Sequence, residues 1–402
     1  MFAIYLIARH IGHLITGKTI LTVPPTSISR RAWLQRAGLA SAAAATPGWA
    51  QPGKSTAGTR NVVIAQLVDF SVSQQDVSKD FLIGSRAAWL DINAKGGIRG
   101  RLVTHLAVET DGAATSVRST LLATVNNPAC IALSGTVGDM LASQIAAISN
   151  QAGANIAHVA PWLQSTTREV DDKTFPIFAT RQEQISHALK NLAAMGTKTL
   201  GAVFASSVEY AAYHVEIGRI AASMQLELKS FQGTGDLRLL GQKFTPETPP
   251  ILLFLGGTPE LVQFTQGLEK QARQRYIVAL ADVNLQTLQQ MGAARNTPII
   301  ATQPVPMVNA SIPVVRQFRE TLARLFDEPP TTHSLAGFIA ARYTFEVLNS
   351  IDGPLTRQSA LTGFQSRASL NVGGFRVSFD AARRSGAYVT QSMVAVDGRL
   401  IG

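Results

Sequence analysis

The chain has 402 residues, 46% of them apolar and 15% charged, with a formal net charge of +10. Half of that charge comes from residues 1–50, which contain five basic residues and no acidic one. Basic residues elsewhere are scattered and form no stripe with aromatics, which argues against a nucleic-acid partner. The roughly 350 residues after this region exceed what one core typically holds, so we expect two lobes.

The N-terminal region reads as an export signal. The sequence from Ser29 to Gln35 contains Arg30 and Arg31, precedes the weakly apolar run 37–45, and resembles a twin-arginine signal. That run is too short to span a bilayer. Residues 1–50 are therefore predicted to be a signal region, and residues 51–60, rich in Gly, Ser, Thr and Pro, a flexible leader. An amphipathic N-terminal helix is the alternative, and residues 1–26 suggest an overlong gene start or a second anchor.

Cysteine usage agrees with export. Cys130 is the only cysteine, so the sequence permits no intrachain disulfide and no site built from several cysteines. No cysteine follows the signal run, which excludes a lipid anchor at a mature N-terminal cysteine. We expect a soluble periplasmic protein.

Apolar runs of strand length alternate with segments of helical periodicity through residues 61–160. This alternation predicts a parallel sheet with helices on both faces. The expected strands are Val62–Leu67, Leu102–Val108, Ile131–Leu133 and Ile156–Val159, and the expected helices are Lys79–Ala94, Ala113–Val125 and Met140–Gln151.

The same alternation starts again after a connection near Phe175–Arg181. Expected strands are Thr199–Phe204, Leu226–Phe231, Ile251–Leu255, Tyr276–Leu280 and Ile299–Ala301, and expected helices are Ala211–Met224, Leu237–Lys243, Pro259–Gln271 and Leu285–Met291. Pro304 and Pro306 suit an extended return crossing. Helices Val314–Phe326 and Leu335–Ile351 would then join the first lobe, with terminal strands at Val372–Val377 and Tyr388–Val396. The predicted lobes are 61–178 with about 307–380, and 179–306 with about 381–402.

The segment Ile92–Gly100, within INAKGGIRGR, combines a helix end, a turn and a new strand. Gly96 can adopt the left-handed conformation that ends a helix, Ile98 can pack back on the last turn, and Gly100 permits the turn that follows. The segment resembles the INA-x-GGI-x-G sequence of type I periplasmic solute-binding proteins, specifically the receptors of branched-chain amino-acid (Leu/Ile/Val-binding) ABC transporters.

This resemblance implies a two-lobed α/β fold in which each lobe is a parallel sheet flanked by helices and crossover strands form a hinge. A ligand would bind between the lobes, at the carboxyl ends of the strands. The implied function is capture of an amino acid or a related small molecule and its delivery to an inner-membrane ABC permease. The protein is expected to be a monomer with no cofactor. A sensory module of the same fold and an exported α/β enzyme are the alternatives.

Two loops of the first lobe supply candidate ligand contacts. Gly138 and Asp139 follow the strand Ile131–Leu133, where the resemblance implies a small hydroxyl residue that holds a ligand carboxylate. Asp139 would repel a carboxylate, or it caps its own helix. The next loop contains Trp162, Leu163 and Gln164. Trp162 is either an apolar wall for the ligand or part of the core.

The second lobe supplies three further candidates. The resemblance implies that Tyr210 stacks on the ligand and that Asp282 holds its ammonium group. The alternative for Asp282 is the N-cap of Leu285–Met291. Thr258 follows Gly256 and Gly257, whose missing side chains allow a ligand to approach the backbone. The run from Asp69 to Val77 departs from the family's usual Pro-Leu-Ser-Gly, which puts a standard branched-chain site in doubt.

Enzyme signatures are absent from the sequence. It contains no G-x-S-x-G, P-loop, HExxH or G-x-G-x-x-G motif. The histidines show no metal-binding spacing, and His105 and His158 fall within predicted strands. We therefore expect a binding protein rather than an enzyme.

Overall fold

A computed structural model describes residues 61–166, 169–193, 197–291, 297–385, 388–394 and 400–401. The predicted signal region 1–50 and leader 51–60 lie outside these residues. The described residues all belong to one compact unit, and the following description concerns that unit alone. None of the described helices is long and apolar enough to span a membrane.

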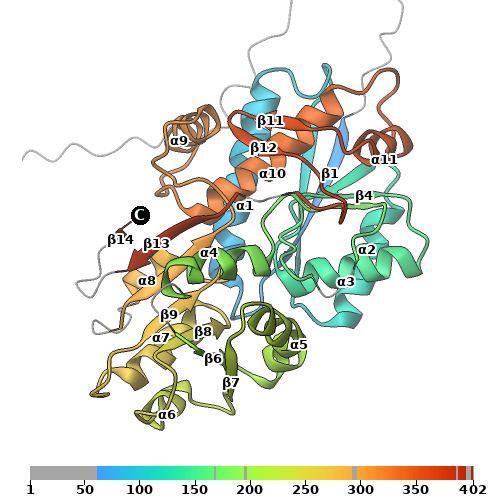
Figure 1. Ribbon diagram of the computed structural model, residues 1–402. Coiled ribbons are helices and arrows are strands. Elements are labelled where there is room, and N and C mark those ends of the chain that lie inside the picture. Colours follow the sequence, from blue (N-terminus) through green and yellow to red (C-terminus); the bar gives the residue numbers. More distant parts are fainter. Residues whose placement is uncertain are drawn as a thin grey trace, which may run out of the picture. The chain divides into compact units, whose positions relative to one another are not determined.

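The first lobe is built on a sheet of five parallel strands in the order β2-β1-β3-β4-β5. The strands are β1 (Val62–Asp69), β2 (Val103–Thr110), β3 (Cys130–Ser134), β4 (Ala157–Val159) and β5 (Thr174–Phe175). Its helices are α1 (Gln75–Ala94), α2 (Ala114–Asn126), α3 (Asp139–Gln151), α9 (Pro313–Leu325), α10 (Thr332–Asn349) and α11 (Arg357–Gln365). Figure 1 shows the late helices α9–α11 lying beside the early elements of this lobe.

Alternate residues of β1 face opposite sides of the sheet, and both sides are covered. Val62 and Ile64 belong to the core formed with α1 and α10, whereas Ala65 and Leu67 belong to the core formed with α2 and α3. A strand covered on both faces is apolar along its whole length, because neither set of side chains meets water. This explains the nearly continuous apolar run of β1.

The second lobe contains a seven-stranded sheet in the order β14-β13-β10-β9-β8-β6-β7. The strands are β6 (Thr199–Phe204), β7 (Glu227–Gln232), β8 (Ile251–Leu255), β9 (Tyr276–Ala279), β10 (Ile299–Gln303), β13 (Thr390–Val394) and β14 (Leu400–Ile401). Its helices are α4 (Arg181–Ala193), α5 (Ser207–Ser223), α6 (Leu237–Gln242), α7 (Thr258–Leu268) and α8 (Leu285–Gln290). Strands β13 and β14 are antiparallel to their neighbours, and the others are parallel.

The predicted helix-to-strand junction is confirmed. Gly96 and Gly97 take positive φ angles of 100° and 72°, and the N–H of Gly97 donates to the carbonyl of Ile92. Ile98 and Arg101 exchange backbone hydrogen bonds around a tight turn, and the Ile98 side chain is buried. The two-lobed α/β fold with parallel sheets is likewise confirmed.

Four elements were not predicted: β5, α4, α11 and β14. The strand expected at Val372–Val377 is instead a hairpin of β11 (Leu370–Val372) and β12 (Phe375–Val377). Gly373 and Gly374 take positive φ angles of 55° and 99°, which reverse the chain between the two strands. Helix α5 begins four residues before its predicted start, because the Ser206 side chain caps it by accepting from the Val208 N–H.

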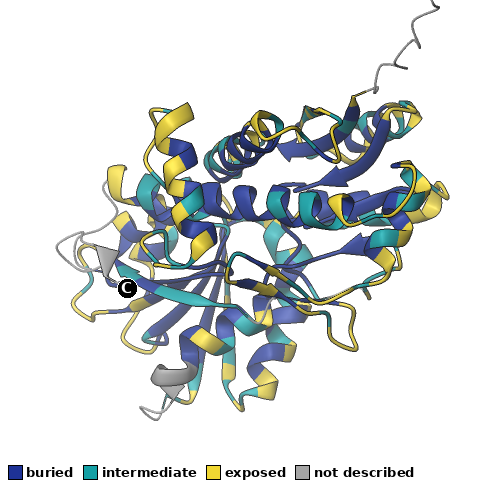
Figure 2. Ribbon diagram, turned by 90° about the horizontal axis from the view of Figure 1, so that it is seen from above, coloured by how far each residue is buried: buried dark blue, intermediate teal, exposed yellow. Residues whose placement is uncertain are grey.

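Helices α1 and α10 pack against each other unusually closely. A Cβ atom added at Gly84 would lie 1.7 Å from the Ser334 carbonyl oxygen, and one added at Gly337 would lie 1.9 Å from the Phe81 carbonyl oxygen. Glycine at both positions therefore brings the two helix backbones into contact. Figure 2 shows buried residues along the strands and the inward faces of the helices.

The single cysteine lies in this interior. Cys130 begins β3, and its side chain is completely buried with Ala65, Leu121 and other apolar residues. Burial raises the pKa of its thiol, against a smaller lowering effect of Arg357. Cys130 is therefore a core residue.

Candidate functional site

A cavity of about 340 Å³ lies between the two lobes. From the first lobe it is lined by Asp69 at the end of β1, by Gly112 after β2, and by Gly138 and Asp139 after β3. All of these residues lie at the carboxyl edge of a parallel sheet. This is where ligands bind in open α/β folds.

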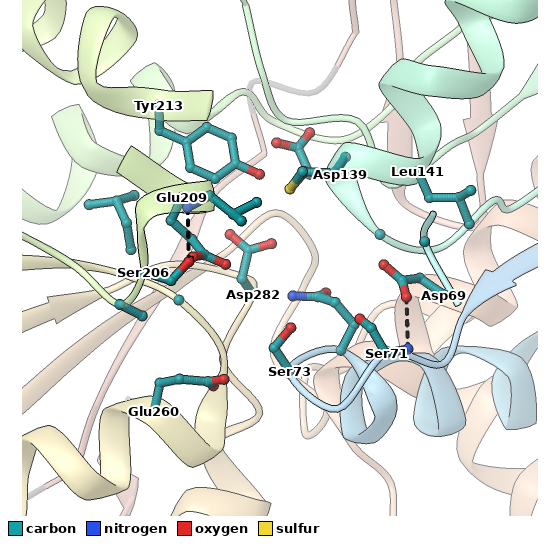
Figure 3. Close-up of a pocket in the computed structure, with 18 of the residues that line it drawn as sticks. Asp69, Ser71, Ser73, Asp139, Leu141, Ser206, Glu209, Tyr213, Glu260 and Asp282 are labelled. Atoms are coloured by element: carbon teal, nitrogen blue, oxygen red, sulfur yellow. Dashed lines mark hydrogen bonds between the residues drawn. The ribbon is translucent and has the colours of Figure 1, made fainter. Parts of the chain in front are cut away.

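The second lobe contributes the equivalent edge of its own sheet. Ala205 and Glu209 follow β6, Gly256 follows β8, and Asp282 follows β9. Figure 3 shows Asp69 and Asp139 on one side of the cavity, Glu209 and Glu260 on the other, and Asp282 between them. The two walls therefore come from different lobes.

A buried arginine links the acidic residues behind the cavity. Arg181, the first residue of α4, is fully buried, and its Nη1 and Nη2 atoms both lie 3.0 Å from Oδ2 of Asp139. Nη2 is also 3.3 Å from Oδ2 of Asp282, and Nη1 is 3.6 Å from Oε2 of Glu216. The guanidinium carbon lies 4.2 Å from the ring centre of Tyr213, which lines the cavity.

Electrostatics keep Arg181 charged. Burial by itself would lower the pKa of Arg181, but the nearby groups, with Asp139 first, hold it well above its usual value. Burial also raises the pKa of Asp282, and the charge of Arg181 opposes that rise. The arrangement is therefore one permanent cation shared among three buried or nearly buried carboxyl groups.

Asp139 lines the cavity and does not cap α3, so the capping interpretation is wrong. Gly138 occupies the N-cap position with a φ of 107°. Oδ1 of Asp139 accepts hydrogen bonds from the backbone N–H groups of Gln164 (2.7 Å) and Ser165 (3.0 Å), and Oδ2 accepts from Arg181. These donors, which are distant in the sequence, hold the carboxylate away from its own helix.

Asp282 also lines the cavity, and it is not the N-cap of α8. That position belongs to Asn284, whose side chain accepts from the N–H groups of Gln286 and Thr287. Asp282 instead meets Arg181 and, at 3.4 Å, Nε2 of Gln164. The ammonium site implied for Asp282 is therefore partly occupied by a cation of the protein itself.

The loop carrying Trp162, Leu163 and Gln164 does not line this cavity. Trp162 is completely buried, with edge contacts to Phe81 and Phe178. Gln164 is buried and accepts from the Gln184 side chain, and Leu163 lines a separate cavity. Trp162 is therefore a core residue and not a wall of the cavity, because the aromatic cluster of the first lobe surrounds it.

The two remaining candidates also lie outside the cavity lining. Tyr210 stacks on His214 with ring centres 4.6 Å apart, and Tyr213, about one turn further along α5, lines the cavity instead. Thr258 is fully buried, and its hydroxyl donates to Asp76 of α1 at 2.6 Å. Thr258 therefore joins the lobes rather than facing a ligand.

Sequence reasoning missed several lining residues. Besides Tyr213, they include Ser71, Ser73, Asp111, Ser206, Glu209 and Glu260. Their shared signal is position, since most follow strand ends at the carboxyl edge of a sheet. The departure at Asp69–Val77 points to two of these residues, Ser71 and Ser73.

Comparison with known proteins identifies the class. Residues 61–396 match the family model described as periplasmic binding protein, and the chain belongs to this family. Its members are binding proteins, and the protein is accordingly a periplasmic solute-binding protein rather than an enzyme. Among curated proteins, none matches the sequence.

Solved structures share the fold at low sequence identity. A substrate-binding periplasmic protein from Ralstonia solanacearum is 19% identical, with a TM-score of 0.75, over 85% of this chain and 99% of that one. An extracellular ligand-binding receptor from Verminephrobacter eiseniae is 17% identical, with a TM-score of 0.74, over 85% of this chain and 100% of that one. The branched-chain amino-acid transporter substrate-binding protein LivJ from Streptococcus pneumoniae, solved with isoleucine, is 15% identical, with a TM-score of 0.68, over 85% and 98%.

Proposed function

We propose that this protein is an exported receptor that captures an amino acid or a related small molecule between its lobes and delivers it to an inner-membrane ABC permease. The observation that carries the proposal is the cavity between the carboxyl edges of the two sheets, with polar side chains from both lobes. Its volume of about 340 Å³ suits a small solute. The isoleucine complex of the Streptococcus pneumoniae protein supports an amino-acid-like ligand.

Side-chain hydrogen bonds between the lobes support a hinged mechanism. Thr258 donates to Asp76 at 2.6 Å, and Asn284 donates to Asp80 at 2.8 Å. A ligand that contacts both walls would favour the closed arrangement over more open ones, because only the closed form lets both walls bind it.

Binding is tested with the protein purified from the periplasm after export. A thermal-shift screen against amino acids, amides, amines, aromatic acids and polyols is expected to find stabilising ligands. At 100 times its Kd, a ligand stabilises the fold by about 2.7 kcal/mol. Small-angle scattering should then show a smaller radius of gyration with the ligand. Stabilisation without any change in scattering would contradict closure.

Transport is tested in the source cell. Deleting the gene should abolish uptake of the ligand identified in the screen, and plasmid-borne protein should restore it. Normal uptake in the deletion strain would contradict delivery to a permease. A lost transcriptional response with normal uptake would instead favour the sensory alternative.

Export is tested separately through Arg30 and Arg31. Changing both to Lys should leave the precursor in the cytoplasm, since the twin-arginine route reads the arginine pair. The measurement is the amount of mature protein in periplasmic extracts. An unchanged periplasmic yield would mean that another export route is used.

A further inference from the structure

The cavity lining is acidic and lacks a basic residue. Among the described residues that line it, six have carboxyl groups and none is Lys, Arg or His; the six are Asp69, Asp111, Asp139, Glu209, Glu260 and Asp282. Such a low-dielectric cleft lined by one sign of charge attracts ions of the opposite sign. The acidic lining therefore favours a positively charged ligand.

Asp69 shows that this charge is directed at the cavity. Asp69 is 6% exposed, and its Oδ1 accepts a hydrogen bond from the N–H of Ser71 at 2.8 Å. The other oxygen, Oδ2, makes no hydrogen bond or ion pair with any described residue, and Figure 3 shows it turned toward the cavity. This oxygen is therefore free to accept a hydrogen bond from a ligand in the cavity.

On the opposite wall, Oε2 of Glu260 is buried without a hydrogen-bond partner. Burial raises the pKa of Glu260, hydrogen bonds from the backbone at Glu260 and Gly257 oppose that rise, and the charges of Glu209 and Asp76 add to it. Glu209 accepts a short hydrogen bond from the Ser206 hydroxyl but has no basic partner among the described residues. A cation at this wall would relieve the repulsion between these carboxylates.

Arg181 cannot supply that cation. Its single charge is already shared by Asp139, Asp282 and Glu216 behind the cavity. Asp69 and Glu260 make no ion pair with a described residue. The charge on both walls is therefore left for a ligand.

A free ligand carboxylate finds little to hold it here. The resemblance placed a carboxylate beside the start of α3, but that position carries Asp139. The cavity offers only neutral donors, such as the hydroxyls of Ser71 and Ser73. A zwitterionic α-amino acid would set its carboxylate against carboxylates of the protein, which costs binding energy.

A metal ion fits the arrangement poorly. In the part of the chain that the structure describes, no group of three or more His, Cys, Asp or Glu side chains is placed to hold one. The carboxylates lie on opposing walls of a cavity of about 340 Å³ (Figure 3). Charges spread over that space match an extended organic ion better than a single metal centre.

We propose that the cavity binds an organic amine cation that lacks a free carboxylate, with Asp69 on one wall and Glu260 on the other as its charge partners. This inference rests on the proposed function and narrows it to one class of solute. Ion pairs with hydrogen bonds would fix the ammonium groups, and the side chains of Leu141, Val208 and Tyr213 would contact the carbon chain.

The test compares ligands that differ by one carboxylate. The pairs are cadaverine and lysine, agmatine and arginine, and isoamylamine and leucine, measured by isothermal titration calorimetry on the exported protein. We expect at least one amine to bind at least tenfold more tightly than its amino acid. Equal or tighter binding of the amino acids would overturn the inference and leave the proposed function intact.

Charge-neutral variants test the two walls. Asp69→Asn keeps an acceptor for the Ser71 N–H, and Glu260→Gln keeps nearly the same shape. Each should weaken amine binding at least tenfold. Glu320→Gln makes the same charge change on an exposed residue of α9, outside the cavity, and should leave binding unchanged. Unchanged amine binding in both wall variants would overturn the assignment of the charge partners.

The two proposals fail in different ways. If the screen finds only neutral or anionic solutes, the amine inference falls while the receptor function stands. If no solute of any class binds the correctly folded protein, the receptor function falls and the amine inference falls with it.

Discussion

Both terminal nitrogens of Arg181 lie 3.0 Å from the same oxygen of Asp139, and both side chains are almost completely removed from solvent. The contact joins the first residue of α4 to the first residue of α3. Two elements of different lobes are thus held by one ion pair behind the cavity.

Removing this cation should strongly destabilise the protein. Arg181→Met fills similar space but leaves Asp139, Asp282 and Glu216 without their shared charge partner. We expect a loss of about 3–5 kcal/mol in the free energy of unfolding, since a broken buried pair leaves uncompensated charge. Urea denaturation at pH 7 measures it. The control is Arg238→Met, which removes an exposed pair with Asp236 and should change stability little. Equal stability of the Arg181 variant and the natural protein would contradict the prediction.

Asn284 should stabilise the protein chiefly as a helix cap. Asn284→Ala removes the acceptor for the Gln286 and Thr287 N–H groups and should cost about 0.5–2 kcal/mol. Asn284→Ser keeps a capping oxygen but loses the hydrogen bond to Asp80, and should retain most of that stability. The comparison uses urea midpoints for the three proteins. If the serine variant were as unstable as the alanine variant, the bond to Asp80 would be the larger contribution.

The close packing of α1 and α10 should make Gly337 intolerant of a side chain. Gly337→Ala would place Cβ against the Phe81 carbonyl and force the helices apart. It should lower the free energy of unfolding by about 1–3 kcal/mol. Gly218→Ala on α5 meets no atom within 4 Å and should be neutral or stabilise by up to about 1 kcal/mol, because alanine favours helix. Thermal unfolding of both variants checks the opposite signs. Equal effects would mean that helix contact does not select glycine at position 337.

His158 should make stability depend on pH. Burial lowers the pKa of His158 from 6.5 to about 4, against a smaller opposing effect of Asp171. Because the folded pKa lies below the unfolded value, the unfolded chain binds the proton more readily. Neutral His158 therefore contributes fully to the free energy of unfolding above pH 6.5. This contribution is lost as pH falls from 6.5 to about 4, at about 1.4 kcal/mol per pH unit.

A variant separates this effect from the titration of carboxyl groups. His158→Gln can keep a contact with the Thr136 hydroxyl, 3.0 Å from Nε2, without titrating. Urea unfolding of both proteins at pH 7.5, 6, 5 and 4.5 should show the steeper loss in the natural protein. Parallel curves would mean that His158 does not titrate differently on unfolding.

Local sequence signals predicted most of the fold. The glycine stop at Gly96, the buried Ile98 and the alternation of apolar strands with helices depend on neighbouring residues, and the structure confirms them. The hairpin at Gly373 and Gly374 was missed because the apolar pattern of its two short strands reads as one run. Helix α4 was missed because the segment between the connection near Phe175–Arg181 and the strand Thr199–Phe204 was assigned no element.

The site depended on contacts that no local pattern contains. Asp139 has the sequence of a helix cap, but Arg181, 42 residues further on, and two loop N–H groups draw its carboxylate elsewhere. Tyr210 is the position to which the family resemblance assigns a stacking tyrosine, whereas Tyr213, about one turn further along α5, lines the cavity. A resemblance in sequence does not fix which side of a helix faces the cavity.

The burial of Cys130 makes the protein suited to site-specific fluorescent labelling. A thiol-reactive dye needs an accessible thiolate, and the only natural thiol is enclosed in the first lobe with a raised pKa. A cysteine introduced by Val208→Cys, at a half-exposed position on the rim of the cavity, would then be the one reactive site. A polarity-sensitive dye attached there would change its emission when a bound solute displaces water around it, which would turn this binding protein into an optical reporter of that solute's concentration.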